Sequence, residues 1–342
     1  MEISKELIKE LPKTDLHVHL DGSLRLQTLQ DLARQQNVEL PASGQEELKK
    51  LVMSGKNCRN LKEYLNGFDI TLSVMQEPEA LERIAFELAE DAAEENIWYM
   101  EVRFSPILHI KRGLKLTTIV DAVLEGLQTA EKKFNIKTGI IICGMRNINP
   151  ETSLRLAELS TAYKNKGVVG FDLAGQEENY PAKDHKEAFS LIRKNNINTT
   201  AHAGEAFGPE SIHQAIHDCG AHRIGHGTRL YEDGDLLNYV NDHRIPLEIC
   251  ITSNIQTGAA KTYESHPFRF YYDYGLRVTI NTDNRLVSGT TITDEYYLVA
   301  KHLNLNLDDI KSIIIDGFKS AFLPNRAKSI MLNVVNDRLK KY

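Results

Sequence analysis

The sequence is poor in cysteine. Only four cysteines occur among 342 residues, namely Cys58, Cys143, Cys219 and Cys250. No two of them have the Cys-x-x-Cys spacing of structural zinc and redox motifs. So few thiols are typical of a reducing compartment, where each one packs as a small buried side chain. We therefore expect neither a disulfide framework nor a cysteine-based metal centre.

The sequence also lacks the features that take a chain to a membrane. Its best apolar run, residues 139–145, suits one buried strand and is far too short to cross a bilayer. The first residues, MEISKE, are charged and precede no apolar region of the signal-peptide kind. These absences predict a cytoplasmic protein with no membrane partner.

Basic clusters and a dinucleotide-binding motif are missing as well. The chain carries 41 Lys and Arg against 47 Asp and Glu, for a net charge of -6, and its basic residues are dispersed. This balance argues against a nucleic-acid partner. No Gly-x-Gly-x-x-Gly follows the first predicted strand, which disfavours an open dinucleotide-binding sheet.

What the sequence does contain is a repeated unit, a short apolar strand followed by a helical pattern. After a first strand around residue 17, strands are predicted at 97–106, 137–146, 167–175, 197–205, 221–228, 245–254 and 277–284. The clearest helical patterns cover 79–95, 118–134 and 150–166.

Eight such units predict an α/β fold, a (β/α)8 TIM-type barrel, with a doubly wound open sheet as the structural alternative. We expect residues 1–342 to form a single barrel domain. The extra length between the first two strands, residues 22–76, is interpreted as a helical insertion that covers one end of the barrel.

The first strand presents two histidines on one face. His17 and His19 are separated by one residue within an apolar alternation, and side chains two apart in a strand point the same way. Both imidazoles can therefore reach one metal ion. Asp21 continues this face where the strand ends.

Other predicted strands end in residues of the same chemical kind. In barrels of this class the chemistry sits at the carboxyl ends of the strands. Those ends supply His202 and Glu205 after the fifth strand, His226 after the sixth and Asp283 after the eighth. Three histidines with one carboxylate are a suitable ligand set for Zn²⁺ or another divalent transition metal.

Glu205 requires a turn to join this group. It follows His202 by three residues, so in a continuous strand it would face the other way. Gly204 allows the backbone to turn and bring the carboxyl group toward the site. The alternative is an exposed glutamate at the start of the next helix.

Other polar residues of the sequence are given structural roles. Histidines without strand-end context are expected to be surface or loop residues, namely His109, His185, His213, His217, His222, His243, His266 and His302. Glu101 and Arg103 alternate in the second strand, which suggests an ion pair inside the barrel.

Six motifs, each at a predicted strand end, together resemble the adenosine deaminase family of the amidohydrolase superfamily. They occur in the family's order over nearly the whole chain, as TDLHVHLDGS (14–23), EVRFSP (101–106), DLAG (172–175), HAGE (202–205), GHG (225–227) and NTD (281–283). The resemblance implies zinc-dependent hydrolytic deamination of adenosine and deoxyadenosine to inosine and deoxyinosine, with release of ammonia.

The resemblance also implies roles for individual residues. One zinc ion per subunit would be held by His17, His19, His202 and Asp283. Glu205 would protonate the purine N1, and His226 would orient or deprotonate the attacking water, with Asp283 aiming that water as well. His19, Asp21, Gly175 and Asn284 would contact the substrate, Asp21 at the ribose 5′-hydroxyl, Gly175 at N3 and Asn284 at N7.

Two related chemistries are disfavoured. Zinc nucleobase deaminases of a different fold carry a Pro-Cys-x-x-Cys signature, which this chain lacks. Many barrel amidohydrolases hold two metals bridged by a modified lysine at the end of strand four. That strand here reads GFDLAG and has no lysine, so a single metal is favoured.

One position departs from the family pattern. Where the family commonly has Thr-Asp-Asp-Pro, this chain has Thr282, Asp283, Asn284 and Arg285. Asn284 can still donate an N–H to N7. Arg285 adds a cation, which leaves open a substrate with an anionic or bulky 5′ group. The alternative for Arg285 is a structural ion pair with a neighbouring acid.

Three hypotheses about function follow. The first is a deaminase of adenosine and deoxyadenosine. The second is a deaminase of another 6-aminopurine compound, such as aminodeoxyfutalosine, a 5′-modified adenosine or adenine. The third is a non-catalytic protein on a deaminase scaffold, which the complete set of six site residues argues against. The sequence makes no prediction of oligomeric state.

Overall fold

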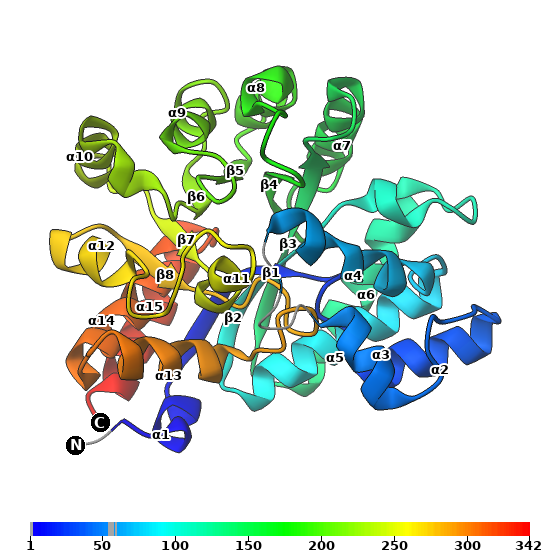
Figure 1. Ribbon diagram of the computed structural model, residues 1–342, viewed down its shortest axis with the longest axis horizontal. Coiled ribbons are helices and arrows are strands. Elements are labelled where there is room, and N and C mark those ends of the chain that lie inside the picture. Colours follow the sequence, from blue (N-terminus) through cyan, green and yellow to red (C-terminus); the bar gives the residue numbers. More distant parts are fainter. Residues whose placement is uncertain (1–2, 54–57, 59) are drawn as a thin grey trace.

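The fold is a barrel of eight parallel strands with helices around it (Figure 1). The computed structural model describes residues 3–53, 58 and 60–342. The strands pair with their neighbours in chain order, each with the next. Their bounds are β1 (Lys13–His19), β2 (Ile97–Phe104), β3 (Lys137–Met145), β4 (Val168–Ala174), β5 (Asn198–Ala203), β6 (Arg223–His226), β7 (Leu247–Ile249) and β8 (Val278–Ile280). The predicted (β/α)8 fold is confirmed.

Helices follow the strands on the outside of the barrel. Four lie between β1 and β2, namely α2 (Leu26–Gln36), α3 (Gln45–Val52), α4 (Leu61–Ser73) and α5 (Pro78–Glu94). The others are α1 (Lys5–Glu10), α6 (Leu116–Lys133), α7 (Pro150–Ala162), α8 (Lys186–Lys194), α9 (Pro209–His217), α10 (Gly234–Asp242), α11 (Ile251–Gln256), α12 (Phe268–Tyr274), α13 (Ile292–His302), α14 (Leu307–Ser320) and α15 (Asn325–Leu339). None of the helices described here is long and apolar enough to span a bilayer.

Main-chain contacts between β1 and the segment after β8 join the two ends of the sheet. Asp283 donates its N–H to the carbonyl of His17 at 2.8 Å, and its own carbonyl accepts the N–H of His19 at 2.7 Å. Val18 and Asp283 form an isolated parallel bridge between these bonds. Closure of the barrel therefore also holds three candidate metal-binding residues together.

Charged side chains pair with one another inside the barrel. Arg103 contacts Asp172 at 3.0 Å and Glu248 at 2.8 Å, while Glu101 pairs with Arg223. All five are 0–1% exposed, so each charge is compensated inside the barrel. The expected Glu101–Arg103 pair is wrong. The two side chains share a face of β2, but partners on other strands meet them instead.

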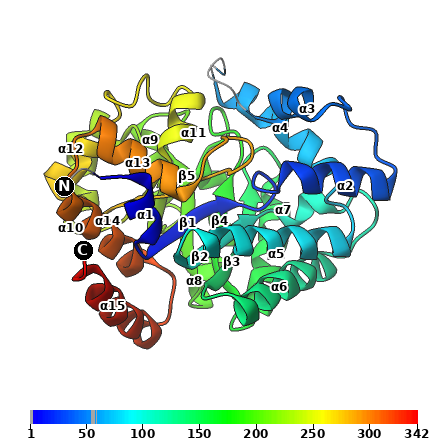
Figure 2. The ribbon, with the colours of Figure 1, turned by 90° about the horizontal axis from the view of Figure 1, so that it is seen from below.

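The insertion after β1 covers one side of the strand ends. Helices α2, α3 and α4, drawn in blue, gather beside the barrel (Figure 2). One face of α4 carries residues spaced three and four apart that line the central cavity, namely Leu61, Tyr64, Leu65, Phe68 and Leu72. The predicted helical insertion after the first strand is confirmed. Of the residues 22–76 assigned to it, 54–57 and 59 lie outside the described part of the chain.

The seventh strand is shorter than the sequence suggests. The apolar run at 245–254 predicts a strand throughout, but β7 ends at Ile249 and helix α11 begins at Ile251. A short apolar run does not distinguish a buried strand from a buried helix. The consequence is functional, because α11 carries Asn254 into the site described next.

Candidate active site

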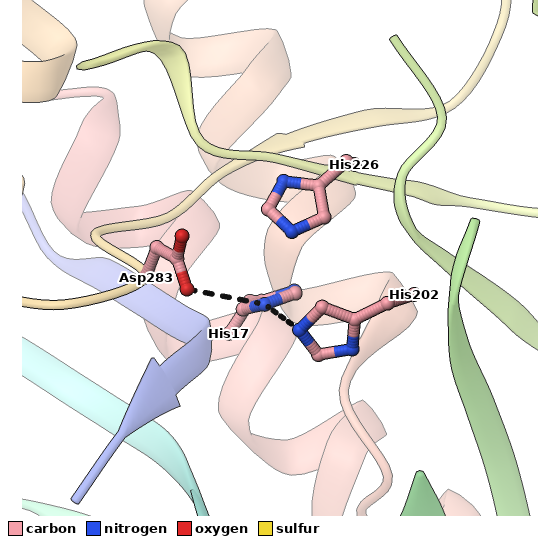
Figure 3. A group of neighbouring side chains, drawn as sticks. All are labelled: His17, His202, His226 and Asp283. Atoms are coloured by element: carbon pink, nitrogen blue, oxygen red, sulfur yellow. Dashed lines mark hydrogen bonds and ion pairs between the residues drawn. The ribbon is translucent and has the colours of Figure 1, made fainter. Parts of the chain in front are cut away.

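Four donor groups from distant parts of the chain meet at the carboxyl ends of the strands. Nε2 of His202 lies 3.1 Å from Nε2 of His17 and 3.1 Å from Nε2 of His19. Oδ1 of Asp283 lies 3.6 Å from Nε2 of His17 and 3.4 Å from Nε2 of His19. Figure 3 shows His17, His202 and Asp283 pointing toward one another, with His226 beside them.

The separations suit one small divalent cation. Four ligands at about 2.1 Å from a tetrahedral zinc ion are about 3.4 Å apart. The four measured separations of this set lie between 3.1 and 3.6 Å. A second grouping is also compact, since the donor atoms of His17, His202, His226 and Asp283 lie within 4.8 Å of one another. Either way, the structure contains a buried metal site of three histidines and one aspartate.

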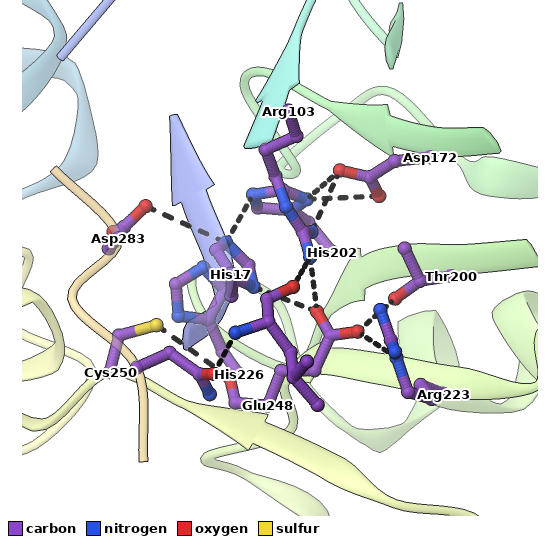
Figure 4. Close-up of polar contacts among 12 residues, drawn as sticks. His17, Arg103, Asp172, Thr200, His202, Arg223, His226, Glu248, Cys250 and Asp283 are labelled. Atoms are coloured by element: carbon purple, nitrogen blue, oxygen red, sulfur yellow. Dashed lines mark hydrogen bonds and ion pairs between the residues drawn. The ribbon is translucent and has the colours of Figure 1, made fainter. Parts of the chain in front are cut away.

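Carboxylates behind two of the rings determine which nitrogen faces the centre. Nδ1 of His17 lies 2.9 Å from Glu248, and Nδ1 of His202 lies 3.0 Å from Asp172 (Figure 4). An Nδ1–H that donates to a carboxylate leaves the Nε2 lone pair free for a metal. The two lone pairs then face each other at 3.1 Å. A cation between them removes this repulsion.

The electrostatics of the pocket keep the His17 ring neutral. Burial, reinforced by the charge of Arg103, holds the pKa of His17 well below its ordinary value. Burial alone would raise the pKa of Asp172, but His202 and Arg103 hold it far below its ordinary value. Neutral imidazoles backed by ionised carboxylates are the form in which histidine binds metals.

Strained backbone aims three of the site residues. His226 and Asp283 have φ values of 63° and 60°, in the left-handed region that side-chain-bearing residues rarely adopt. Gly204 has φ 71° and makes the turn that the sequence required for Glu205. Such outliers cost of order 1–3 kcal/mol each at non-glycine positions and cluster at functional sites.

Glu205 is turned into the site and is only 6% exposed. Oε2 lies 3.5 Å from Nε2 of His226, and Oε1 accepts the hydroxyl hydrogen of Thr257 at 3.0 Å. Burial raises the pKa of Glu205 well above its ordinary value, and the charges of Asp283 and Glu177 raise it further. The raised pKa favours the protonated form of this carboxyl group.

The remaining predicted contacts line one cavity of about 240 Å³ together with His19, His202 and Asp283. Asp21 is 5% exposed, its Oδ1 has no hydrogen-bond partner among the described residues, and burial raises its pKa to about 7. Gly175, with φ 93°, and Asn284 also line the cavity. The Asn284 amide donates to the hydroxyl of Tyr64 at 2.7 Å, which ties α4 to the segment after β8.

Arg285 does not face this cavity. Its guanidinium is ion-paired with Glu95, a residue that also accepts the backbone N–H of Thr293 at 2.9 Å. Both members of the pair are 10% exposed at the side chain. The structural alternative for Arg285 is therefore correct, and the notion that it recognises an anionic substrate group is wrong.

Comparison with known proteins agrees with this site. The model of the family described as adenosine deaminase matches residues 12–338, almost the entire chain. The chain belongs to the adenosine deaminase family. It is accordingly a hydrolase of the class that acts on cyclic amidines.

Individual members of the adenosine deaminase family are similar over nearly the full chain. Adenosine deaminase of Clostridium kluyveri is 43% identical over 326 residues, which are 94% of this chain and 92% of that protein. A probable adenosine deaminase of Dictyostelium discoideum is 44% identical over 340 residues. That match takes in 99% of this chain but 44% of the relative, so the chain spans less than half of that protein.

A solved structure has the same fold. The apo N6-methyl-AMP deaminase of Arabidopsis thaliana superposes with a TM-score of 0.88 at 26% sequence identity. The alignment covers 99% of this chain and 100% of that one.

A residue outside the family motifs quoted above holds the Glu205 loop. The carboxylate of Glu177, 4% exposed, accepts four consecutive backbone N–H groups of residues 204–207 at 2.6 to 3.0 Å. Sequence reasoning missed Glu177, which lies two residues beyond the DLAG motif. Its only signal was an acidic residue just after a strand end.

Glu177→Gln tests whether these four hydrogen bonds, called the Glu177 clamp here, hold Glu205 in place. A glutamine oxygen accepts fewer of the four N–H groups, so Glu205 loses its fixed position and one negative neighbour. We expect kcat for adenosine to fall roughly 10- to 100-fold with bound metal unchanged. Steady-state kinetics and metal analysis check this, with the exposed Glu178→Gln as control. A kcat within twofold of wild type would refute the clamp.

Three of the histidines that were expected to be surface or loop residues are buried. His109, His185 and His266 are 0%, 2% and 3% exposed, so none of them lies at the surface, although His266 does lie in a loop as expected. Each has a buried partner, such as the carbonyl of Met75, which accepts Nδ1–H of His109 at 2.9 Å. Their burial depends on tertiary packing that periodicity alone does not reveal. None of the three belongs to the metal-binding group.

Burial of His109 predicts acid destabilisation. It lowers the pKa of His109 to about 4, whereas the unfolded value is about 6.5. As pH falls, the unfolded chain takes up this proton before the folded chain does. The contribution of neutral His109 to the free energy of unfolding is therefore complete above pH 6.5 and is lost as pH falls toward 4. His109→Gln should therefore reduce the drop in unfolding free energy between pH 7 and pH 5 by about 2 kcal/mol. Urea titrations at both pH values measure it, and equal drops would refute it.

Proposed function

We propose that the protein hydrolytically deaminates adenosine and 2′-deoxyadenosine to inosine and 2′-deoxyinosine, releasing ammonia. The observation that carries this proposal is one cavity in which a buried three-histidine, one-aspartate site lies beside Glu205, a carboxyl group with a raised pKa. Metal activation of water and proton donation are the two requirements for adding water to a purine ring. Relatives named adenosine deaminase at 43% identity support the same reaction.

His17, His19, His202 and Asp283 would hold one zinc ion per subunit. Their nitrogen and oxygen donors are of the type that zinc prefers, and their separations fit its coordination sphere. When bound, zinc lowers the pKa of water and so makes a nucleophile available at neutral pH. Asp283 has a second oxygen with which to accept a hydrogen bond from that water.

Glu205 would donate its proton to N1 of the purine. Adding water to C6 removes the aromaticity of the ring, and the reaction is slow unless N1 receives a proton. The raised pKa of the buried Glu205 carboxyl favours the protonated form that this step requires. Asp283 would accept the proton that the water loses on attack and pass it to the amino group. The C6–N bond then breaks and ammonia leaves, while the C6 hydroxyl returns its proton to Glu205 and becomes the carbonyl of inosine.

His226 would orient the attacking water. Its Nε2 lies 3.5 Å from Glu205, and its Nδ1 accepts a hydrogen bond from the Asn254 amide at 3.0 Å.

Other residues that line the cavity would contact the substrate. The unpartnered Asp21 oxygen is an acceptor for the ribose 5′-hydroxyl, with His19 beside it on the same strand face. Gly175 has no side chain and leaves its backbone accessible for N3. Asn284 has a second amide hydrogen for N7 beyond the one it donates to Tyr64.

We expect a strong preference for nucleosides over nucleotides. The described residues that line the cavity include the acids Asp21 and Asp69 and no Lys or Arg. A 5′-phosphate would be desolvated beside Asp21 with no cation to compensate it. Turnover of adenosine should thus exceed that of AMP by at least about 100-fold in kcat/KM, corresponding to an interaction of about 3 kcal/mol.

The experiment is an ultraviolet assay of zinc-loaded protein against adenosine, deoxyadenosine, AMP, adenine and 5′-modified adenosines. Adenosine and deoxyadenosine should be the best substrates. Absence of turnover of every compound would refute the proposed function. Faster turnover of AMP would refute the charge argument alone, and faster turnover of adenine or an uncharged 5′-modified compound would establish the second hypothesis.

A further inference from the structure

A line of buried hydrogen bonds reaches His226 from behind. The backbone N–H of Phe268 donates to Nδ1 of His266 at 3.1 Å. Nε2 of His266 lies 3.2 Å from Oδ1 of Asn254, and Nδ2 of Asn254 lies 3.0 Å from Nδ1 of His226. Asn254 is 0% exposed, His226 is 1% exposed and His266 is 3% exposed. Water does not compete for these groups.

The first donor fixes the direction of the whole line. A backbone N–H can only donate, so Nδ1 of His266 carries no proton. The neutral ring then carries its proton on Nε2 and donates it to the Asn254 oxygen. This contact orients the amide, whose nitrogen must face His226. Because an amide nitrogen only donates, Nδ1 of His226 has to accept.

We propose that Asn254 and His266 are positioning residues that hold His226 in the tautomer protonated on Nε2. The inference rests on the proposed function, because it gives His226 a task in that reaction. An Nε2 that already carries the proton can donate a hydrogen bond to the attacking water but cannot remove its proton. Of the two roles that the family resemblance leaves open, orientation of the water is therefore selected.

The hydrogen-bonded line from His266 through Asn254 to His226, called the relay below, runs through the segment that follows β7. Asn254 lies in α11 directly after β7, and His266 precedes α12. Thr257, at the end of α11, holds the Glu205 carboxyl from the same element. The segment after β7 thus positions both His226 and Glu205, although it supplies no metal ligand of its own.

The first test reads the tautomer directly. In zinc-loaded protein with ¹⁵N-labelled histidine, long-range ¹H–¹⁵N spectra distinguish a protonated ring nitrogen from an unprotonated one, and His226→Gln assigns the signals. Wild type should show an unprotonated Nδ1 and a protonated Nε2. Asn254→Asp replaces the donor with an acceptor of the same shape and should move a proton to Nδ1. A protonated Nδ1 in wild type, or an Nδ1 unaffected by Asn254→Asp, would overturn the proposal.

The second test uses a conservative pair at His266. Gln at this position keeps an N–H near Nε2 and can still donate to Asn254, whereas Leu cannot. We expect His266→Leu to lower kcat roughly 10- to 100-fold with KM changed less than about threefold, and His266→Gln to recover most of the loss. His185→Gln, at an equally buried histidine outside the relay, controls for loss of packing. Equal kcat values for the Leu and Gln variants would contradict the relay.

The two proposals fail separately. A wild-type protein that deaminates no 6-aminopurine compound refutes the proposed function, while the ring spectra still report the tautomer. A wild-type protein that turns over adenosine but has its His226 proton on Nδ1 refutes the relay alone.

Discussion

Glu205→Gln should lower kcat for adenosine by roughly 10²- to 10⁴-fold while the protein keeps its zinc. A positioned general acid contributes about this much, and an amide has no proton of suitable acidity for N1. Glutamine has nearly the same shape and can still meet Thr257 and His226. The change therefore removes the proton and leaves the packing. Steady-state kinetics and metal analysis of the purified variant measure both properties.

The matched control for this variant is Glu210→Gln on α9. Glu210 is exposed, and its side chain accepts the Gln214 amide at 3.1 Å without approaching the cavity. Its kcat should stay within twofold of wild type. Retained activity in Glu205→Gln would remove Glu205 from the mechanism, and loss of zinc would make it a ligand instead.

His19→Ala should weaken zinc binding, whereas His226→Ala should leave it unchanged. His19 lies within 3.1 to 3.4 Å of two other donors, so its loss leaves zinc with one ligand fewer. We expect zinc affinity to fall by more than about 100-fold, beyond the effect of losing a supporting residue behind a ligand. His226→Ala should retain zinc and lose kcat, because its Nε2–H serves the water.

Competition with a chromophoric chelator measures zinc affinity for both variants, and the exposed His217→Ala serves as their control. The reverse pattern, with zinc lost in His226→Ala and kept in His19→Ala, would assign the fourth ligand position to His226. That result would favour the compact grouping of His17, His202, His226 and Asp283.

The barrel and its metal site were accessible from sequence because both follow from periodicity. Side chains alternate along a strand, so His17 and His19 had to share a face. Parallel strands place their carboxyl ends at one edge, so His202 and Asp283 had to meet them there. Gly204 marked the turn that brings Glu205 back, since a positive φ at that point favours glycine.

The supporting residues were not accessible because their partners are set by tertiary packing. Asn254 lies where the sequence predicted a continuous strand, and His266 had no periodic context at all. Glu177 contacts a loop 27 to 30 residues away through backbone N–H groups, which leave no trace in side-chain patterns. Arg285 meets Glu95, 190 residues distant, and no local signal connects the two.

The most direct test of zinc-dependent adenosine deamination is product formation from adenosine as zinc is returned to metal-free protein. We expect inosine and ammonia to form in equal amounts, and the rate to rise linearly until one zinc ion is bound per chain and then to stay constant. A protein that holds one zinc ion per chain and converts no adenosine, or one that is fully active without metal, would contradict it.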